Sequence, residues 1–285
     1  DALKDINRRL VYMAISGFGT EGTLRRAPAY DPIIQAHSGM AATQGGDESP
    51  TFIRSLLCDK ITAYTACQAV TSALFARERS GEGQLVDLSM LDAGLFFMFP
   101  DGFQNHALLD DDVIPGGLLI DILYDLTLTR DGGITVAAAN QEMQGRMLNA
   151  IGLLYLLQDE RFNTMAKLVE NLHLFRKEVA KKCLEYTSDE LIALLREVEV
   201  PCAKCLSRDD VLAQDQLTAN DSTAIVEHPH LGQMRIVKAP PRFGGRRLEP
   251  ARPTPKHGEH SESVLRSYGI DPNTIESLKT AEVLA

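Results

Sequence analysis

One continuous stretch, residues 56–95, constrains the fold more than any other part of this 285-residue sequence. Apolar residues recur every three or four positions from Ile61 to Leu74, and alanines occupy many of the positions between them. This pattern predicts a long helix that is buried nearly all round. A basic final turn and Gly81, which suits a left-handed cap, predict where the helix ends. Residues 84–90 then predict a strand.

Other segments predict strands and helices in the same way. Residues 10–15 are a continuous apolar run, which is typical of a strand covered on both faces. Residues 91–99 are strongly apolar and predict a second buried helix that ends at Pro100. Residues 124–139 alternate around a glycine-containing turn, which predicts a β-hairpin. Helical patterns follow to about residue 198.

Asp59 lies where an extended segment, residues 51–57, gives way to the long helix. At the front of a helix, its carboxylate is expected to accept hydrogen bonds from first-turn backbone N–H groups, which would keep it ionised and fix its direction. An aspartate before a helix is most often only such a cap. Its neighbourhood, with a small-residue helix after it and a glycine-rich turn upstream, also favours a functional carboxylate.

The glycine-rich turn contains Gly17, Gly19 and Gly22, which fit the spacing G-x-G-x-x-G. In dinucleotide-binding proteins, such glycines let a pyrophosphate approach the N-terminus of a helix. Here Pro28 and Pro32 interrupt the segment that would have to form that helix. The motif is therefore a weak indication of a nicotinamide or flavin site.

Composition excludes several classes of function. The net charge of −10 argues against nucleic-acid binding, and it requires local basic residues or helix N-termini if a polyanionic ligand binds. The sequence shows no apolar run long enough to span a bilayer and no signal-peptide pattern near its start, so we expect a cytoplasmic protein. Five cysteines, an odd number, argue against a disulfide framework and for a reducing compartment.

Two of these cysteines, Cys202 and Cys205, have C-x-x-C spacing, which is compatible with a redox pair or half of a zinc site. A zinc site needs two further ligands at suitable spacing, and none is convincing. Pro201 predicts a loop here, whereas a thioredoxin-like pair begins a helix. We therefore expect no metal, and a structural role for the two cysteines is the simpler interpretation.

Several segments resemble family III CoA-transferases, the group that includes formyl-CoA:oxalate transferases, carnitine CoA-transferases and alpha-methylacyl-CoA racemase. The resemblance follows the family order over nearly the whole chain. It is carried by RRLVYMAISGFGTEG, AYDPIIQAHSGM, ALFARERSGEGQLVDLSMLDA, TRDGGITVAAAN, VPCAKCLSRDDVLA, HPHLGQMRIVKAPPRF and GEHSESVLRSYG.

The resemblance implies a function for Asp59, because the matching aspartate of the family is the nucleophile. It implies transfer of CoA between an acyl-CoA thioester and a carboxylic acid, through an aspartyl anhydride and an aspartyl-CoA thioester. Coenzyme A enters as a substrate thioester, and no metal or other cofactor is expected. The segment Pro28, Ala29, Tyr30 and Asp31 matches the part of the family that lines the CoA site.

Tyr30 separates two activities within the family. Racemases carry a catalytic histidine at this position, whereas transferases commonly carry tyrosine. A tyrosine hydroxyl stays protonated at neutral pH and is a poor proton shuttle, so transfer is favoured over racemisation. Arg25 and Arg26 are candidates for pairing with CoA phosphates, although a solvated charged turn is the more common role of such a pair. Gly116 and Gly117 are weaker candidates for a lid over the nucleophile.

The family also implies an α/β fold, with a Rossmann-like large domain built on a parallel sheet and a smaller α+β domain. We expect the large domain in residues 1–119, the small domain in residues 120–225, and a return to the large domain in residues 226–285. The resemblance further implies a homodimer of interlocked subunits. The family's first strands match nothing in this sequence, so exposed sheet edges and a non-catalytic remnant of the fold are the alternative expectation.

Overall fold

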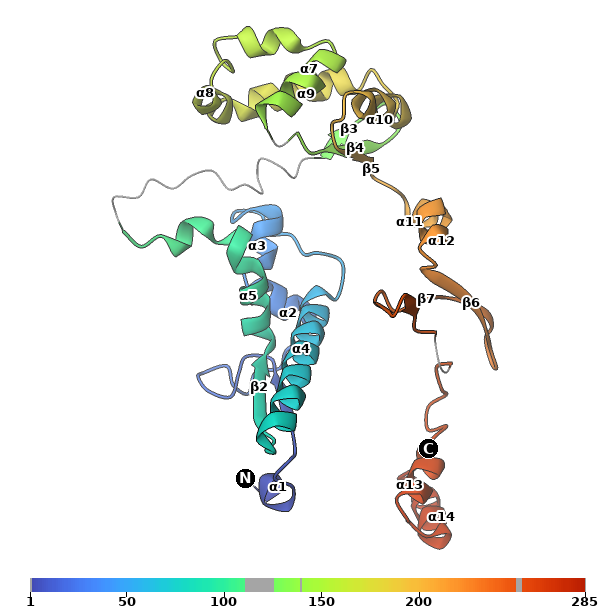
Figure 1. Cartoon of the computed structure of the whole chain (residues 1–285). Helices are drawn as coiled ribbons and strands as arrows, with labels where there is room; N and C mark the ends of the chain where they lie inside the picture. The colour runs from blue at the N-terminus through green and yellow to red at the C-terminus, as the bar shows by residue number, and fades with distance from the viewer. Residues whose placement is uncertain (1, 111–125, 139, 250–252, 285) are drawn as a thin grey trace. The chain divides into compact units, whose positions relative to one another are not determined.

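The structure is a computed structural model that describes residues 2–110, 126–138, 140–249 and 253–284 (Figure 1). The chain divides into two compact units, Asp1–Cys205 and Leu206–Ala285. Both helices and strands are present, and the parallel pairing of two strands confirms a mixed α/β protein. The expected three-domain division and the larger Rossmann-like sheet stay predictions.

The first part of unit 1 is built on two parallel strands with helices between and after them. Strand β1 (Tyr12–Ser16) pairs with β2 (Leu85–Ser89), so that Ser16 lies opposite Ser89. Both strands were expected, but the prediction that the first is covered on both faces is wrong, because Tyr12 and Ile15 are about half exposed. The helices of this part are α1 (Ala2–Ile6), α2 (Asp31–His37), α3 (Met40–Gly45), α4 (Leu57–Ser80), α5 (Met90–Gly102) and the 3-10 helix η1 (Gln104–Ala107).

Helix α4 connects the two strands and runs antiparallel to them. Its C-terminal end lies beside the beginning of β1, since the Gly83 N–H donates to the carbonyl of Arg8 and Arg9 pairs with Glu78 at 3.0 Å. Because α4 has 24 residues and each strand has five, the first turn of α4 lies on the carboxyl side of the strands and beyond their ends. Gly81 takes the expected left-handed cap, with φ of 78°. Helices α2, α4 and α5 pack against one another around a small core that contains Ile34, Met40, Cys58, Ile61 and Ala93.

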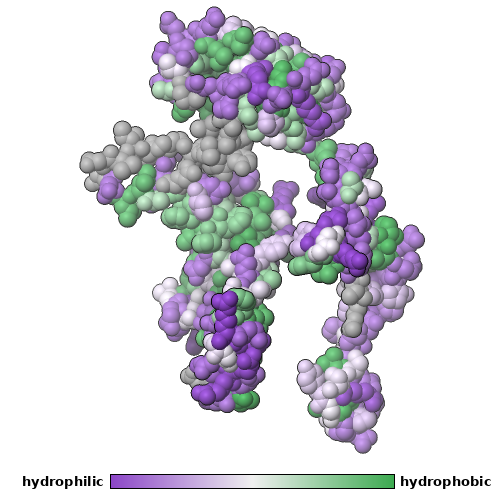
Figure 2. Space-filling model, in the orientation of Figure 1, coloured by the Kyte–Doolittle hydropathy of each residue, from purple (hydrophilic) through white to green (hydrophobic). Residues whose placement is uncertain are grey.

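The prediction that α4 is buried nearly all round is wrong. One side of the helix packs on α2, α5 and β2, and the opposite side carries exposed residues such as Tyr64 and Phe75. Helix α5 was likewise expected to be buried, yet Phe96 and Phe97 are exposed, and it continues through Pro100 to Gly102. Hydrophobic surface is visible in Figure 2 over the region that carries α5 in Figure 1. An apolar sequence pattern identifies the helix but not how many neighbours cover it.

The second part of unit 1 begins with the expected hairpin. Strands β3 (Leu126–Leu128) and β4 (Gly133–Val136) pair antiparallel, and β5 (Cys202–Lys204) pairs with the other edge of β4. The remaining elements are α7 (Gln141–Ala150), the 3-10 helix η2 (Leu154–Gln158), α8 (Met165–Glu170), α9 (Leu172–Cys183) and α10 (Ser188–Glu197).

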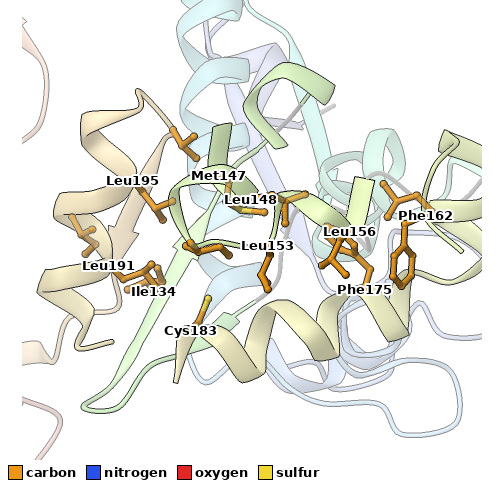
Figure 3. Packing of buried hydrophobic residues seen from close by; sticks show 14 residues of the cluster. Ile134, Met147, Leu148, Leu153, Leu156, Phe162, Phe175, Cys183, Leu191 and Leu195 are labelled. Atoms are coloured by element: carbon orange, nitrogen blue, oxygen red, sulfur yellow. The ribbon is translucent and has the colours of Figure 1, made fainter. Parts of the chain in front are cut away.

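These helices and strands enclose a well-defined hydrophobic core (Figure 3). Leu148 from α7 and both Leu191 and Leu195 from α10 have at most 1% of their surface exposed, and Ile134 from β4 is fully buried. Helix α10 starts with a capping box in which Thr187 is the N-cap and Glu190 returns the hydrogen bond. Burial of large aliphatic side chains is the main source of stability in this part.

Unit 2 contains short elements. Strands β6 (Thr223–His228) and β7 (Gly232–Val237) form an antiparallel hairpin, and β8 (Arg242–Phe243) pairs with β9 (Arg246–Arg247). Lys238 is almost fully buried, and its ammonium donates to the carboxylates of Asp221 and Glu249 at 3.0 and 2.9 Å. The helices are α11 (Arg208–Ala213), α12 (Asp215–Ala219), α13 (Ser261–Ser267) and α14 (Pro272–Thr280).

The core shown in Figure 3 predicts how much single substitutions change the free energy of unfolding. Leu148→Ala should lower the free energy of unfolding by about 2–5 kcal/mol, because it removes buried methyl groups and leaves a cavity. Leu184→Ala is the matched control, since Leu184 is 50% exposed and its truncation should change stability by less than about 1 kcal/mol. Urea unfolding followed by circular dichroism measures both changes. Equal effects of the two substitutions would contradict the packing described.

Candidate functional site

Asp59 is the third residue of α4, which begins at Leu57 after the N-cap residue Leu56. The expectation that its carboxylate caps the helix is wrong: the helix starts two residues earlier, and no side chain caps it. The Asp59 side chain is exposed and, among the described residues, takes part in no hydrogen bond or ion pair. A carboxylate in the first turn is still favoured by the positive end of the helix dipole.

The position of this first turn in the fold is typical of binding sites. Ser16 and Ser89 end the two parallel strands side by side, and Ser89 then caps α5 by accepting a hydrogen bond from the Asp92 N–H at 2.9 Å. The first turn of α4 lies at the same edge of the sheet. In open α/β sheets, ligands bind outside the carboxyl ends of the strands. Asp59 therefore occupies the edge at which a ligand is expected.

Asp31 lies inside the protein and contacts this turn directly. It is the first residue of α2, only 2% of its surface is exposed, and its Oδ2 accepts a hydrogen bond from the backbone N–H of Asp59 at 3.1 Å. By resemblance to the family, Asp31 was expected to line the CoA site. In the structure, its carboxylate faces the start of α4 and holds the backbone of the candidate nucleophile.

The rest of the segment before α2 lies against the glycine-rich turn. Ala29 packs on the core that contains Cys58 of α4, whereas Pro28 and Tyr30 are exposed, Tyr30 to 76%. Gly17 permits this contact, because a Cβ atom at that position would lie 2.3 Å from the Cβ of Ala29. The structure thus brings Ala29, Asp31 and the first turn of α4 together and leaves the Tyr30 ring accessible.

The other predicted site residues are less closely connected to Asp59. Arg25 and Arg26 lie in the turn between β1 and α2, and both are exposed. Gly116 and Gly117 lie outside the described residues, so the lid stays a prediction. The two arginines supply positive charge on an acidic chain, which suits an anionic ligand.

The glycine-rich turn does not have the structure that a dinucleotide site requires. The chain forms mainly turns and bends from Gly17 to Arg26 and has no regular structure in residues 27–30, and the next helix is α2 at Asp31. Gly19 and Gly22 have positive φ angles of 94° and 81°, and the Gly19 N–H donates to Ser16 Oγ at 3.0 Å. A pyrophosphate bound by the motif G-x-G-x-x-G needs a helix that begins within it. The dinucleotide interpretation loses its basis here.

The buried thiol of Cys58 lies beside Asp59 in the chain. Its surface is fully covered, and burial, together with the nearby carboxylates of Asp31 and Asp59, raises the pKa of this thiol to about 11. The thiol therefore stays protonated at neutral pH. Because thiolate is the nucleophilic form of cysteine, Cys58 is chemically inert in the folded protein.

The C-x-x-C pair lies in the second part of unit 1, where Cys202 begins the edge strand β5 and Cys205 follows it. Both cysteines are free thiols, and partial burial raises the pKa of Cys202. The strand replaces the loop that Pro201 suggested. Within residues 2–110, 126–138, 140–249 and 253–284, no group of three or more His, Cys, Asp or Glu side chains is arranged to hold a metal ion.

One residue of this region was not found from the sequence. Gln35 on α2 is 1% exposed and links Asp31 to the backbone of Ile53 and Ser55. A glutamine four residues after Asp31 on a helix was a possible signal, since side chains at positions i and i+4 face each other. The backbone groups that complete the network lie 18 and 20 residues further along the chain. Local spacing gives no indication of them.

Comparison with known proteins identifies the family of the chain. The family model of CoA-transferase family III matches residues 1–261. The chain belongs to this family. It is similar to an acyl-CoA transferase of Fusarium pseudograminearum, with 26% identity over 98% of this chain and 62% of that protein. It is also similar to a succinate–glutarate CoA-transferase of Agrobacterium fabrum, with 27% identity over 93% of this chain and 67% of that protein.

The fold comparison agrees with the family. A crystal structure of a CAIB/BAIF family protein from Brucella suis matches with a TM-score of 0.76 and 25% identity, covering 95% of this chain and 70% of that one. The chain thus spans 62% of the length of the Fusarium relative and 67% of the Agrobacterium relative. Across the described part of this family III chain, no helix is both long and apolar enough to cross a membrane.

The close approach at Gly17 is testable by substitution. Gly17→Ala should lower the free energy of unfolding by about 1–3 kcal/mol, because the new methyl group must displace Ala29. Gly145→Ala is the matched control in the interior of α7, where the nearest atom to the new Cβ is 3.9 Å away. That change should raise stability by about 0.5–1 kcal/mol through better helix propensity. Urea unfolding compares the two, and a Gly17→Ala protein as stable as the wild type would show that the contact is absent.

Proposed function

We propose that this family III chain transfers CoA from an acyl-CoA thioester to a carboxylic acid, with Asp59 as the nucleophile. One observation carries the proposal. The Asp59 carboxylate projects into solvent from the first turn of α4, at the carboxyl edge of the parallel strands, while its backbone is fixed from inside by Asp31. Two relatives are named as an acyl-CoA transferase and a succinate–glutarate CoA-transferase, which supports the same chemistry.

The reaction that this arrangement supports has four steps. A carboxylate oxygen of Asp59 attacks the thioester carbonyl carbon, the C–S bond breaks, and CoA leaves as the thiolate. The thiolate then attacks the aspartyl carbonyl of the resulting anhydride, which releases the donor acid as a carboxylate and leaves an aspartyl-CoA thioester. An acceptor carboxylate attacks this thioester to form a second anhydride and free the thiolate. Attack of the thiolate on the acceptor carbonyl gives the new acyl-CoA and restores Asp59.

This chemistry needs a carboxylate that is ionised and accessible. The dipole of the 24-residue helix α4 favours the negative charge of Asp59. Each oxyanion intermediate needs hydrogen-bond donors, and backbone N–H groups of the glycine-rich turn are candidates. The exposed side chains of Arg25 and Arg26 are candidates for contact with CoA phosphates. Tyr30 stands where a racemase would carry a histidine, so transfer is preferred to racemisation. The interlocked homodimer and the cytoplasmic location stay predictions.

Substitution of Asp59 tests the proposal. Asp59→Asn and Asp59→Ala should abolish CoA transfer, with a loss of at least about 10⁴-fold, because the nucleophile itself is removed. Transfer is followed by chromatographic separation of the two acyl-CoA esters, and the aspartyl-CoA adduct is located by mass measurement of the Asp59 peptide. Asp59→Asn keeps the shape of the side chain and should leave the fold unchanged.

The control is Asp189→Asn, which removes an exposed first-turn carboxylate from α10 and should leave transfer unchanged. Substantial transfer by purified Asp59→Ala protein would refute the role of Asp59. A wild-type chain that neither binds CoA in calorimetric titration nor exchanges it would identify a non-catalytic member of the family. Exchange of the α-proton of a 2-methylacyl-CoA without transfer would identify a racemase.

A further inference from the structure

Two buried polar side chains on α2 connect three segments of the chain at the start of α4. Asp31 and Gln35 are 2% and 1% exposed. The two N–H bonds of the Gln35 amide serve three acceptors, so one of them is shared: Asp31 Oδ1 lies at 2.6 Å, and the carbonyl oxygens of Ile53 and Ser55 each lie at 3.1 Å. Its Oε1 accepts a hydrogen bond from the N–H of Ile53 at 3.0 Å. Gln35 therefore holds both the segment that leads into α4 and the carboxylate of Asp31.

Asp31 extends this network to the candidate nucleophile. Its second oxygen, Oδ2, accepts the backbone N–H of Asp59 at 3.1 Å. That N–H belongs to the first turn of α4, where no carbonyl of the same helix is available to accept it. Leu56 offers no side-chain cap. A residue 28 positions earlier in the chain thus supplies the acceptor that a local cap would normally supply.

The burial of this carboxylate needs an explanation, because a buried charge is costly unless donors or a counter-ion compensate it. Asp31 lies in the first turn of α2 and faces the first turn of α4, so both helix dipoles favour its negative charge. Each carboxylate oxygen has one donor among the described residues, the Gln35 amide for Oδ1 and the Asp59 N–H for Oδ2. Such directional hydrogen bonds define the position of the backbone more strictly than an apolar contact does.

We propose that Asp31 and Gln35 are positioning residues that fix the backbone of Asp59 and thereby the direction of its carboxylate. The expected effect on catalysis rests on the proposed function. The expected effect on the backbone of Asp59 rests on the hydrogen bonds alone. A nucleophile must be held within a fraction of an ångström of its productive position, and displacement by 1 Å can cost about 100-fold in rate. In Figure 1, α2 lies beside the first part of α4, where these residues act.

Asp31→Asn is the most informative substitution, because it keeps the shape of the side chain. The new amide keeps an oxygen at only one of the two former carboxylate positions, so either the Gln35 amide or the Asp59 N–H then faces an NH2 group, which cannot accept. We expect kcat for CoA transfer to fall about 10- to 100-fold, with KM for the acyl-CoA changed by less than about threefold. Gln35→Glu should act in the same direction, since the carboxylate that it introduces has no N–H to donate to Asp31 or to the two backbone carbonyls.

Two further measurements separate positioning from loss of folded protein. Titration of the aspartyl-CoA adduct by intact mass gives the number of active sites, so that kcat is expressed per competent molecule. Amide hydrogen exchange of Asp59 reports its hydrogen bond without any need for activity, and Asp31→Asn should accelerate it by about 10-fold or more. Ile34→Val, at a buried neighbour on α2, is the control for general destabilisation and should change neither quantity by more than about twofold.

The outcomes are distinguishable from failure of the proposed function. An inactive wild-type chain refutes the function, and the exchange of the Asp59 amide then decides the positioning role by itself. Unchanged amide exchange in Asp31→Asn overturns the inference whether or not the chain is active. In an active chain, an unchanged kcat per titrated site overturns it as well. Faster exchange together with a reduced kcat and a constant KM supports it.

Discussion

A single hydrogen bond between a buried carboxylate and a backbone N–H joins the start of α2 to the start of α4 at the candidate site. Asp31 Oδ2 accepts from Asp59 at the start of α4, and Gln35 holds Asp31 from the other side. The described core around these residues is small, with five buried hydrophobic side chains. Cys58, the neighbour of Asp59, packs in this core, and the Asp31 hydrogen bond adds a directional contact to that packing.

The second part of unit 1 is held together mainly by apolar packing. Its core contains 14 buried hydrophobic residues among those that the structure describes. Its helices are joined to the sheet by large aliphatic side chains, and its polar contacts, such as the capping box of α10, lie at helix ends. This part is stabilised mainly by its interior. The first part contains the candidate site, and it carries exposed aromatic side chains on α4 and α5 that its own helices do not cover.

The sequence predicted where helices and strands lie better than it predicted which of their faces are buried. The strands, the hairpin and the end of α4 at Gly81 follow from patterns within a few residues, which hydrophobic period and turn chemistry report directly. Exposure of Phe96 and Phe97 did not follow, because an apolar period says which face is apolar and not what covers it. The contribution of Asp31 to the site was also hidden. It depends on a contact across 28 residues, and a buried aspartate looks the same in sequence as an exposed one.

The protonated thiol of Cys58 has a consequence for the fidelity of acyl transfer. In the proposed reaction, a thiolate beside Asp59 would compete with its carboxylate, because a thiolate attacks a thioester more readily and would take the acyl group as an S-acyl cysteine. Complete burial and a pKa of about 11 remove that rival at neutral pH. The same carboxylate of Asp31 that steadies the helix start contributes to this suppression. The surroundings of Cys58 thus keep a competing nucleophile of the proposed reaction protonated, with no change to Asp59 itself.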